Sequence, residues 1–159
     1  MKHDRVNAAG YSPAEAFAYF REACQIVQLS EALLDKVLPD GLHRSHFYII
    51  NHLARGGDGQ PPLQITSAMQ VTKATMSHSL AVLEKRGFIQ TIPCEIDARS
   101  KQVFLTEAGW ALQAQGLGAL TSMFGSFLRE EDYRIMGDTL PGLVAIRKLL
   151  DRNRNAKPA

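Results

Sequence analysis

Apolar residues recur at helical spacing along most of the chain, and this pattern predicts a mainly helical fold. A first helix is expected over residues 13–38, because Ser12, Pro13 and Glu15 form a capping box at its start. A proline and a glycine follow and end it. A second helix is expected over about residues 43–54, with its apolar side chains on one face.

The next two helices are predicted to form a helix-turn-helix. The glycine-rich residues 56–59 indicate a flexible connector before them. A short helix over 63–69 is followed by a turn and by a helix over 72–86, which Thr72 can cap. The polar side chains that the apolar pattern of this helix leaves to solvent are Lys73, Thr75, Ser77, His78 and Ser79. Small polar groups exposed on the second of two helices are typical of a helix-turn-helix.

A charged β-hairpin is predicted directly after these helices. The β-prone runs 88–92 and 103–105 flank a turn-like segment, residues 97–101, which carries Arg99 and Lys101 into solvent. A helix followed by a basic hairpin is the arrangement with which a winged helix contacts DNA. The order of elements therefore indicates a DNA-binding protein.

Two further helices are expected over residues 106–129 and 130–153, with Pro141 and Gly142 kinking or briefly interrupting the last. The helices at the N-terminal and C-terminal ends of the chain carry more apolar surface than one short helix-turn-helix can cover. This surface comprises Phe17, Phe20, Val27, Leu34, Phe124, Phe127, Leu143, Ile146, Leu149 and Leu150. We expect a homodimer built from both chain ends; the alternative is that these helices fold back onto the monomer's own core.

The composition limits the size of the core and the class of protein, but it does not indicate a function. The 159 residues, 45% of them hydrophobic, can bury one core, which we divide into an N-terminal dimerisation helix (1–41), a winged lobe (42–105) and C-terminal dimerisation helices (106–159). A net charge of +2 permits a polyanionic partner without indicating one. No signal peptide or membrane span is evident, so we expect a cytoplasmic protein with no membrane partner. Cys24 and Cys94 indicate no disulfide framework.

Four segments in order resemble the MarR-type winged-helix transcriptional regulators. Residues 42–50 resemble the start of that family's second helix, and 71–77 and 83–89 resemble the two ends of its recognition helix. Residues 97–101 followed by 105–109 resemble its wing and the return to helix. The resemblance implies a mainly α fold with a small β-hairpin wing, dimerised through the N- and C-terminal helices.

The resemblance also implies which residues would face DNA. The recognition helix would enter a major groove and the wing the adjacent minor groove of a pseudo-palindromic operator. The implied DNA-binding residues are Thr72, Lys73, Thr75, Ser77, His78, Arg99 and Lys101. Asp97 would orient Arg99 by a charge-assisted hydrogen bond; the alternative is that the two form an ordinary exposed ion pair.

This chain departs from the family pattern at several of these positions. His78 and Thr91 stand where many members carry arginine, and Cys94-Glu95 replaces a usual Asp-Pro. A lobe with fewer arginines predicts modest affinity, a shallower salt dependence or an operator with unusual bases.

The family resemblance further implies a cleft for a small aromatic effector. Its candidate lining residues are Phe20, His46, Tyr48 and Trp110, with ordinary core packing as the alternative for each. His46 is expected to replace the family's glutamine and to donate one hydrogen bond. A redox sensor at Cys24 is a second alternative, although a buried, inert thiol is favoured there, and Cys94 is expected to be exposed. We predict no metal site.

No catalytic arrangement or cofactor motif is evident, so we expect a protein that is not an enzyme and has no cofactor. The favoured function is a sequence-specific transcriptional regulator, acting as a repressor that a small molecule or other signal releases from DNA. The alternative from another class is a winged-helix protein-interaction module, an adaptor or antirepressor with weak DNA affinity.

Overall fold

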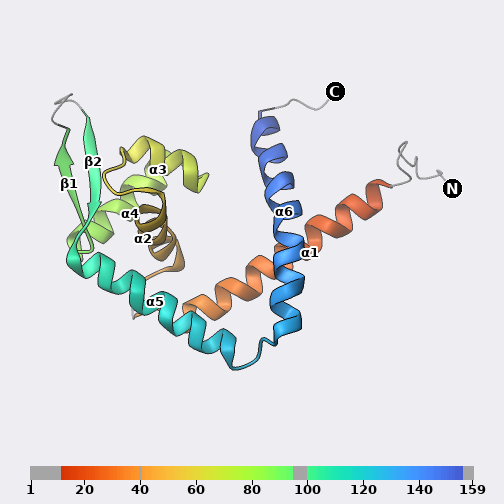
Figure 1. Cartoon of the computed structure of the whole chain (residues 1–159). Coiled ribbons are helices and arrows are strands. Elements are labelled where there is room, and N and C mark those ends of the chain that lie inside the picture. The colour runs from red at the N-terminus through yellow and green to blue at the C-terminus, as the bar shows by residue number, and fades with distance from the viewer. Residues whose placement is uncertain (1–11, 40, 95–99, 156–159) are drawn as a thin grey trace. The chain divides into compact units, whose positions relative to one another are not determined.

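The computed structural model describes residues 12–39, 41–94 and 100–155. Figure 1 shows the order of its elements. They are α1 (Pro13–Asp35), α2 (Arg44–Gly56), α3 (Pro62–Met69), α4 (Lys73–Lys85), β1 (Ile89–Pro93), β2 (Lys101–Leu105), α5 (Glu107–Gly125) and α6 (Glu130–Asn153). The predicted fold class, mainly helical with a two-stranded hairpin, is confirmed.

The chain divides into two compact units, Met1–Leu120 and Thr121–Ala159. The first unit holds α1 to α4, the hairpin and most of α5, and the second holds the end of α5 and α6. The three-part division expected from the sequence stays a prediction. No helix among the described residues is both long and apolar enough to span a bilayer.

The capping box in the sequence correctly predicts where α1 begins. The Ser12 side chain accepts a hydrogen bond from the Glu15 amide at 3.3 Å, and the Glu15 carboxylate accepts one from the Ser12 amide at 2.6 Å. α1 ends at Asp35, three residues before the predicted boundary. α6 continues through Pro141 without a break, so the predicted interruption is wrong.

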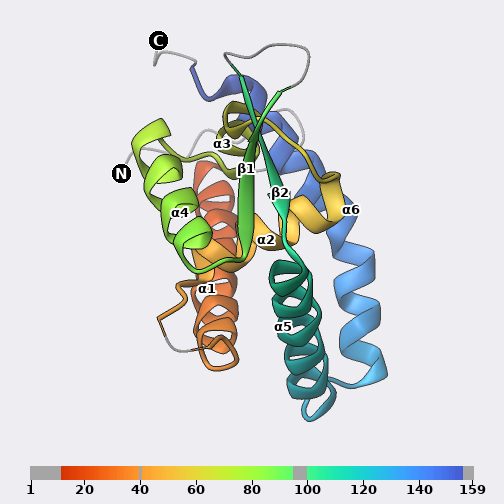
Figure 2. The ribbon, with the colours of Figure 1, turned by 90° about the vertical axis from the view of Figure 1, so that its left-hand side faces the viewer.

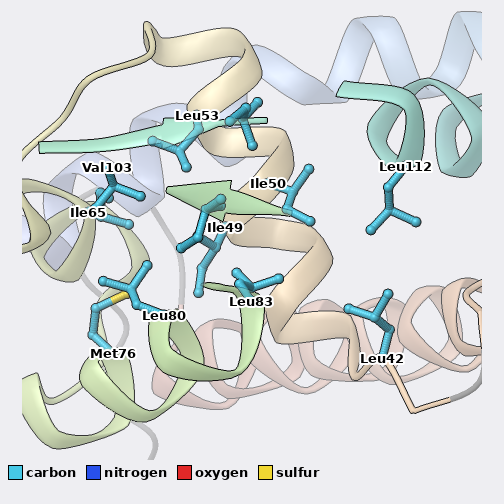
Figure 3. Close-up of a cluster of buried hydrophobic side chains, with 12 residues drawn as sticks. Leu42, Ile49, Ile50, Leu53, Ile65, Met76, Leu80, Leu83, Val103 and Leu112 are labelled. Carbon is cyan, nitrogen blue, oxygen red and sulfur yellow. The ribbon is translucent and has the colours of Figure 1, made fainter. Parts of the chain in front are cut away.

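The core of the first unit lies where α2, α3, α4 and the hairpin meet (Figure 3). Five of its side chains are completely inaccessible to solvent: Ile50, Leu53, Ile65, Leu83 and Val103. Figure 2 shows β1 and β2 pairing along their length, with α4 beside them. The pairing is antiparallel and joins Ile89 to Leu105 at one end and Pro93 to Lys101 at the other. This core fixes the orientation of α4 relative to the hairpin.

The segment before α3 is not the flexible connector that its glycines predict. The Gly59 amide donates to the Val103 carbonyl, and the Val103 amide donates to the Gln60 carbonyl, both at 3.0 Å. The Asp58 carboxylate accepts from the Leu105 amide at 2.8 Å. Gly59 has φ +80°, and a Cβ there would lie 2.8 Å from the Phe104 ring, so glycine is needed for close packing rather than for mobility. This segment fastens α2 to the hairpin.

Candidate nucleic-acid interface

The turn between α3 and α4 presents the start of α4 to solvent. Gln70 adopts a left-handed conformation with φ 56°, which reverses the chain after α3. Thr72 then caps α4: its hydroxyl oxygen accepts from the Thr75 amide at 3.1 Å and lies 2.8 Å from the Thr75 hydroxyl. Both threonines are exposed, as predicted, but their hydroxyls already bond within the cap.

The predicted DNA-facing residues of α4 share its solvent side. Lys73, Thr75, Ser77 and His78 are all exposed. Ser79 is buried, and its predicted exposure is wrong because it lies on the same side of the helix as Leu80 and Leu83. α4 thus offers a cation and small polar groups along its first two turns, a composition suited to contact with phosphates and base edges.

A groove of about 280 Å³ lies between the first turns of α3 and α4. Pro62, Leu63 and Thr66 line it from α3, and Lys73, Met76 and Ser77 line it from α4. Leu63 is 64% exposed, although it is a large apolar side chain. The exposure of Leu63 was not predicted, and its position directly after Pro61-Pro62, in the first turn of α3, was the available signal in the sequence.

The tip of the hairpin carries the remaining predicted contacts. Asp97 and Arg99 lie outside the described residues, so their predicted roles remain predictions. Lys101 is exposed at the start of β2, next to the tip. The Cys94 amide donates to the Ser100 carbonyl at 2.9 Å, which brings the two ends of the tip together.

Glu84 joins the hairpin to α4, a role that the sequence analysis missed. Its carboxylate accepts a hydrogen bond from the Thr91 amide at 2.9 Å, on the edge of β1. A carboxylate in the last turn of a helix interacts unfavourably with the helix dipole. The position of Glu84 was therefore a signal in the sequence that its carboxylate bonds to a group outside the helix. The bond fixes the edge of β1 against the end of α4.

The predicted effector residues are not gathered at one hollow. Phe20, Tyr48 and Trp110 are exposed on α1, α2 and α5, whereas His46 is buried. Tyr48 lines a groove of about 500 Å³ and a smaller apolar hollow of about 90 Å³, and Phe20, His46 and Trp110 line neither of them. An effector cleft with this lining therefore stays a prediction.

His46 has a structural place at the start of α2. Its Nδ1 accepts a hydrogen bond from the His43 amide at 3.3 Å, because His46 lies three residues after the N-cap, where an accepting side chain satisfies an otherwise unpaired amide. The predicted donation of a hydrogen bond by His46 stays a prediction, since the other ring nitrogen can carry the proton. Burial lowers the pKa of His46 below its ordinary value of 6.5, and the neighbouring His43, His78 and Arg86 lower that pKa further.

This lowered pKa predicts a loss of stability in mild acid. Between the lowered pKa and 6.5 the unfolded chain binds a proton at His46 that the folded chain does not bind, so the free energy of unfolding falls as the pH drops below about 6.5. His46→Gln keeps an accepting side chain and cannot titrate. We expect the variant to lose less stability than the wild type between pH 7.5 and pH 5.5 in urea denaturation. Equal losses in the two proteins would show that His46 does not titrate in this way.

The two cysteines differ from their expected environments. Cys24 is exposed on α1, so the prediction of a buried thiol is wrong, because α1 buries only Leu34 among its residues. Cys94 is half-buried rather than exposed, since it lies at the hydrogen-bonded base of the hairpin tip. Among the described residues, no three histidine, cysteine, aspartate or glutamate side chains come close enough to share a metal ion.

Part of this chain matches a known protein family and a curated protein. The model of the MarR family matches residues 40–100, the segment that contains α2, α3, α4 and β1 and ends just before β2. Over these residues the chain is similar to the MarR family. The HTH-type transcriptional regulator PecS of Dickeya dadantii (strain 3937) is 34% identical over 87 residues, which cover 53% of this chain and 52% of PecS. The chain thus matches about half the length of this curated relative.

Solved structures confirm the MarR-family fold over a longer part of the chain. FabT of Streptococcus pneumoniae, solved in complex with DNA, superposes with a TM-score of 0.64 at 21% identity and covers 86% of this chain and 98% of FabT. The PcaV transcriptional regulator of Streptomyces coelicolor, solved with its natural ligand, superposes with a TM-score of 0.62 at 15% identity, covering 77% of this chain and 89% of PcaV. The similarity extends to helices outside the matched MarR-family segment.

Proposed function

We propose that this protein is a sequence-specific DNA-binding transcriptional regulator. The observation that carries the proposal is the exposed, polar first half of α4, set beside a paired hairpin in a chain that is similar to the MarR family over residues 40–100. In a winged helix-turn-helix, such a helix enters the major groove and the hairpin reaches the neighbouring minor groove. FabT, which has the same fold, is solved on DNA, and this supports the proposal. A protein of this kind acts in the cytoplasm with the DNA it binds.

The protein contacts would be shared between α4 and the wing. Thr72, Lys73, Thr75, Ser77 and His78 would face the major groove, where the threonines contribute their methyl groups because their hydroxyls bond within the cap. Arg99 and Lys101 would serve the minor groove and its phosphates, with Asp97 orienting Arg99.

A second copy of the chain is the proposed partner of the terminal helices. α6 buries none of its residues and exposes Tyr133, Ile135, Met136, Leu140, Leu143, Leu149 and Leu150. α1 exposes Phe17, Phe20, Ile26, Val27 and Leu29. Apolar faces of this extent need a partner in water. A twofold dimer would place two lobes on half-sites separated by about one turn of DNA, roughly 34–36 Å.

A small aromatic effector is proposed to release this repressor from DNA. PcaV, which shares the fold, is solved with its natural ligand, and the groove beside Tyr48 offers a place for a ligand on α2. The candidate lining residues Phe20, His46 and Trp110 would have to come from different helices. The exposed thiol of Cys24 keeps redox control as an alternative signal. The exposed, hydroxyl-rich α4 favours DNA over the alternative of a protein-interaction module.

The proposal is tested by selecting bound duplexes from a random DNA library with the full-length protein. We expect an enriched pseudo-palindrome whose half-sites lie about one helical turn apart. Recovery of duplexes without any shared sequence would contradict sequence-specific binding, and a single unpaired half-site would contradict the dimer.

Replacing Arg99 by alanine is expected to weaken operator binding by roughly 1 to 3 kcal/mol and to reduce the salt slope by about one. The reason is that the variant loses a cation at the minor groove while the dimer stays intact. Arg152→Ala, which removes an exposed cation near the end of α6, is the matched control. Binding of Arg99→Ala as tight as that of the control would show that the wing assignment is wrong.

A further inference from the structure

The solvent side of α4 offers few side chains that form paired hydrogen bonds with one base. The helix contains no arginine, asparagine or glutamine, and its lysines, Lys73 and Lys85, are the residues that could recognise guanine in this way. Directly opposite its buried side lie Ala74, His78 and Ala81, all exposed. Methyl groups on either side of one imidazole therefore occupy the strip that a recognition helix presents to base edges.

Leu63 adds an exposed apolar side chain on α3, beside the first turn of α4. Its side chain is 64% exposed and lies in the groove that Lys73 and Ser77 also line. The groove brings the first turn of α3 beside the first turn of α4, so Leu63 is continuous with the proposed DNA-binding surface. Lys73 supplies a positive charge next to it, as a phosphate partner requires.

The hydroxyl groups near this strip are partly committed elsewhere. Thr72 and Thr75 bond to each other at 2.8 Å, and the Thr72 oxygen also accepts from the Thr75 amide. The methyl groups of these two threonines remain available for contact with a base. The surface offered to a base edge is thus more apolar than the polar sequence of α4 indicates.

We propose that this lobe recognises its half-site through the 5-methyl groups of thymine, contacted by Leu63, Ala74 and Ala81, with Lys73 on an adjoining phosphate. Thymine is the base that carries a methyl group in the major groove, and apolar side chains such as alanine contact it there. The proposal rests on the proposed DNA-binding function and specifies its substrate as an operator with thymines at the contacted positions. Each methyl group that is buried contributes about fourfold to affinity.

Replacement of single thymines by deoxyuridine tests this recognition directly. Deoxyuridine removes only the methyl group and keeps base pairing. The operator recovered by selection would be resynthesised with one deoxyuridine at each thymine in turn, and the affinity of the full-length protein measured by fluorescence anisotropy. We expect about fourfold weaker binding at the contacted positions of each half-site and no change at the others.

Variants assign each contact to its residue. In Leu63→Ala, the deoxyuridine penalty should disappear at the thymine that Leu63 contacts, because the two changes remove the same interaction. Gln64→Ala, an exposed neighbour on the same turn of α3, is the matched control and should keep the full penalty. Ala74→Gly should abolish the penalty at a different thymine. A single cooperative thermal transition in each variant, lowered in Ala74→Gly only by the weaker helix propensity of glycine, would show that the fold is intact.

The possible failures are distinguishable. Specific operator binding with no loss at any deoxyuridine would overturn methyl recognition and leave the DNA-binding function standing. A deoxyuridine penalty that persists in both Leu63→Ala and Ala74→Gly would show that other residues contact the methyl groups, and would also overturn the proposal. Absence of any sequence preference would overturn the proposed function itself.

Discussion

Leu140→Glu is expected to convert the proposed dimer into a monomer and to weaken operator binding by more than about 100-fold, because the two half-sites would then be bound separately. Leu140 is 57% exposed on α6, among apolar neighbours such as Met136 and Leu143. A glutamate there would place two unpaired carboxylates in an apolar interface between two copies. Analytical ultracentrifugation would measure the association state, and anisotropy the binding.

The control for this variant is Lys148→Glu, which introduces the same side chain at an exposed polar position of α6. It should remain dimeric and bind operator. A dimeric Leu140→Glu protein would show that α6 does not use this face for dimerisation. A monomeric Leu140→Glu protein that binds as tightly as the wild type would show that dimerisation is not needed for operator affinity.

Gly109→Ala is expected to reduce the free energy of unfolding by about 3 kcal/mol or more, the upper end of the cost of overpacking. A Cβ at Gly109 would overlap the backbone carbonyl of Phe88, which cannot rotate away, and would lie 3.2 Å from Leu105. The Phe88 carbonyl also accepts from the Thr106 amide, so a shift would break the junction between hairpin and α5. Urea denaturation would measure the loss.

Gly118→Ala is the matched control in the same helix. A Cβ there meets nothing within 4 Å among the described residues, so the variant should gain up to about 1 kcal/mol from the better helix propensity of alanine. If the two alanine variants had equal stability, the close approach of α5 to Phe88 would be contradicted.

Local signals in the sequence were sufficient for the helices. Ser12 and Thr72 each make the cap that their positions predict, because a cap depends on residues only three positions apart. The hairpin could also be predicted, since its strands are separated by one short tip and have β-prone composition. The MarR resemblance extended these local predictions to the arrangement of the whole lobe.

Contacts between distant residues could not be predicted in the same way. Asp58 reaches the Leu105 amide across 47 residues of sequence, and a glycine-rich segment therefore looked like a connector although it is fastened to β2. Glu84 bonding to Thr91 and the burial of Ser79 likewise depend on how α4 packs against its neighbours. The exposure of Leu63 could not be predicted either, because an apolar residue in a short helix is more often part of the core.

The central claim is that α4 and the wing bind a specific DNA sequence. Its most direct test is fluorescence anisotropy of the purified full-length protein against a duplex from its own upstream region and against a scrambled duplex, at low and at moderate salt. The account predicts tighter binding to the native duplex, with affinity for both falling as salt rises. Equal affinity for the two duplexes, together with no enriched sequence in the library selection, would contradict it.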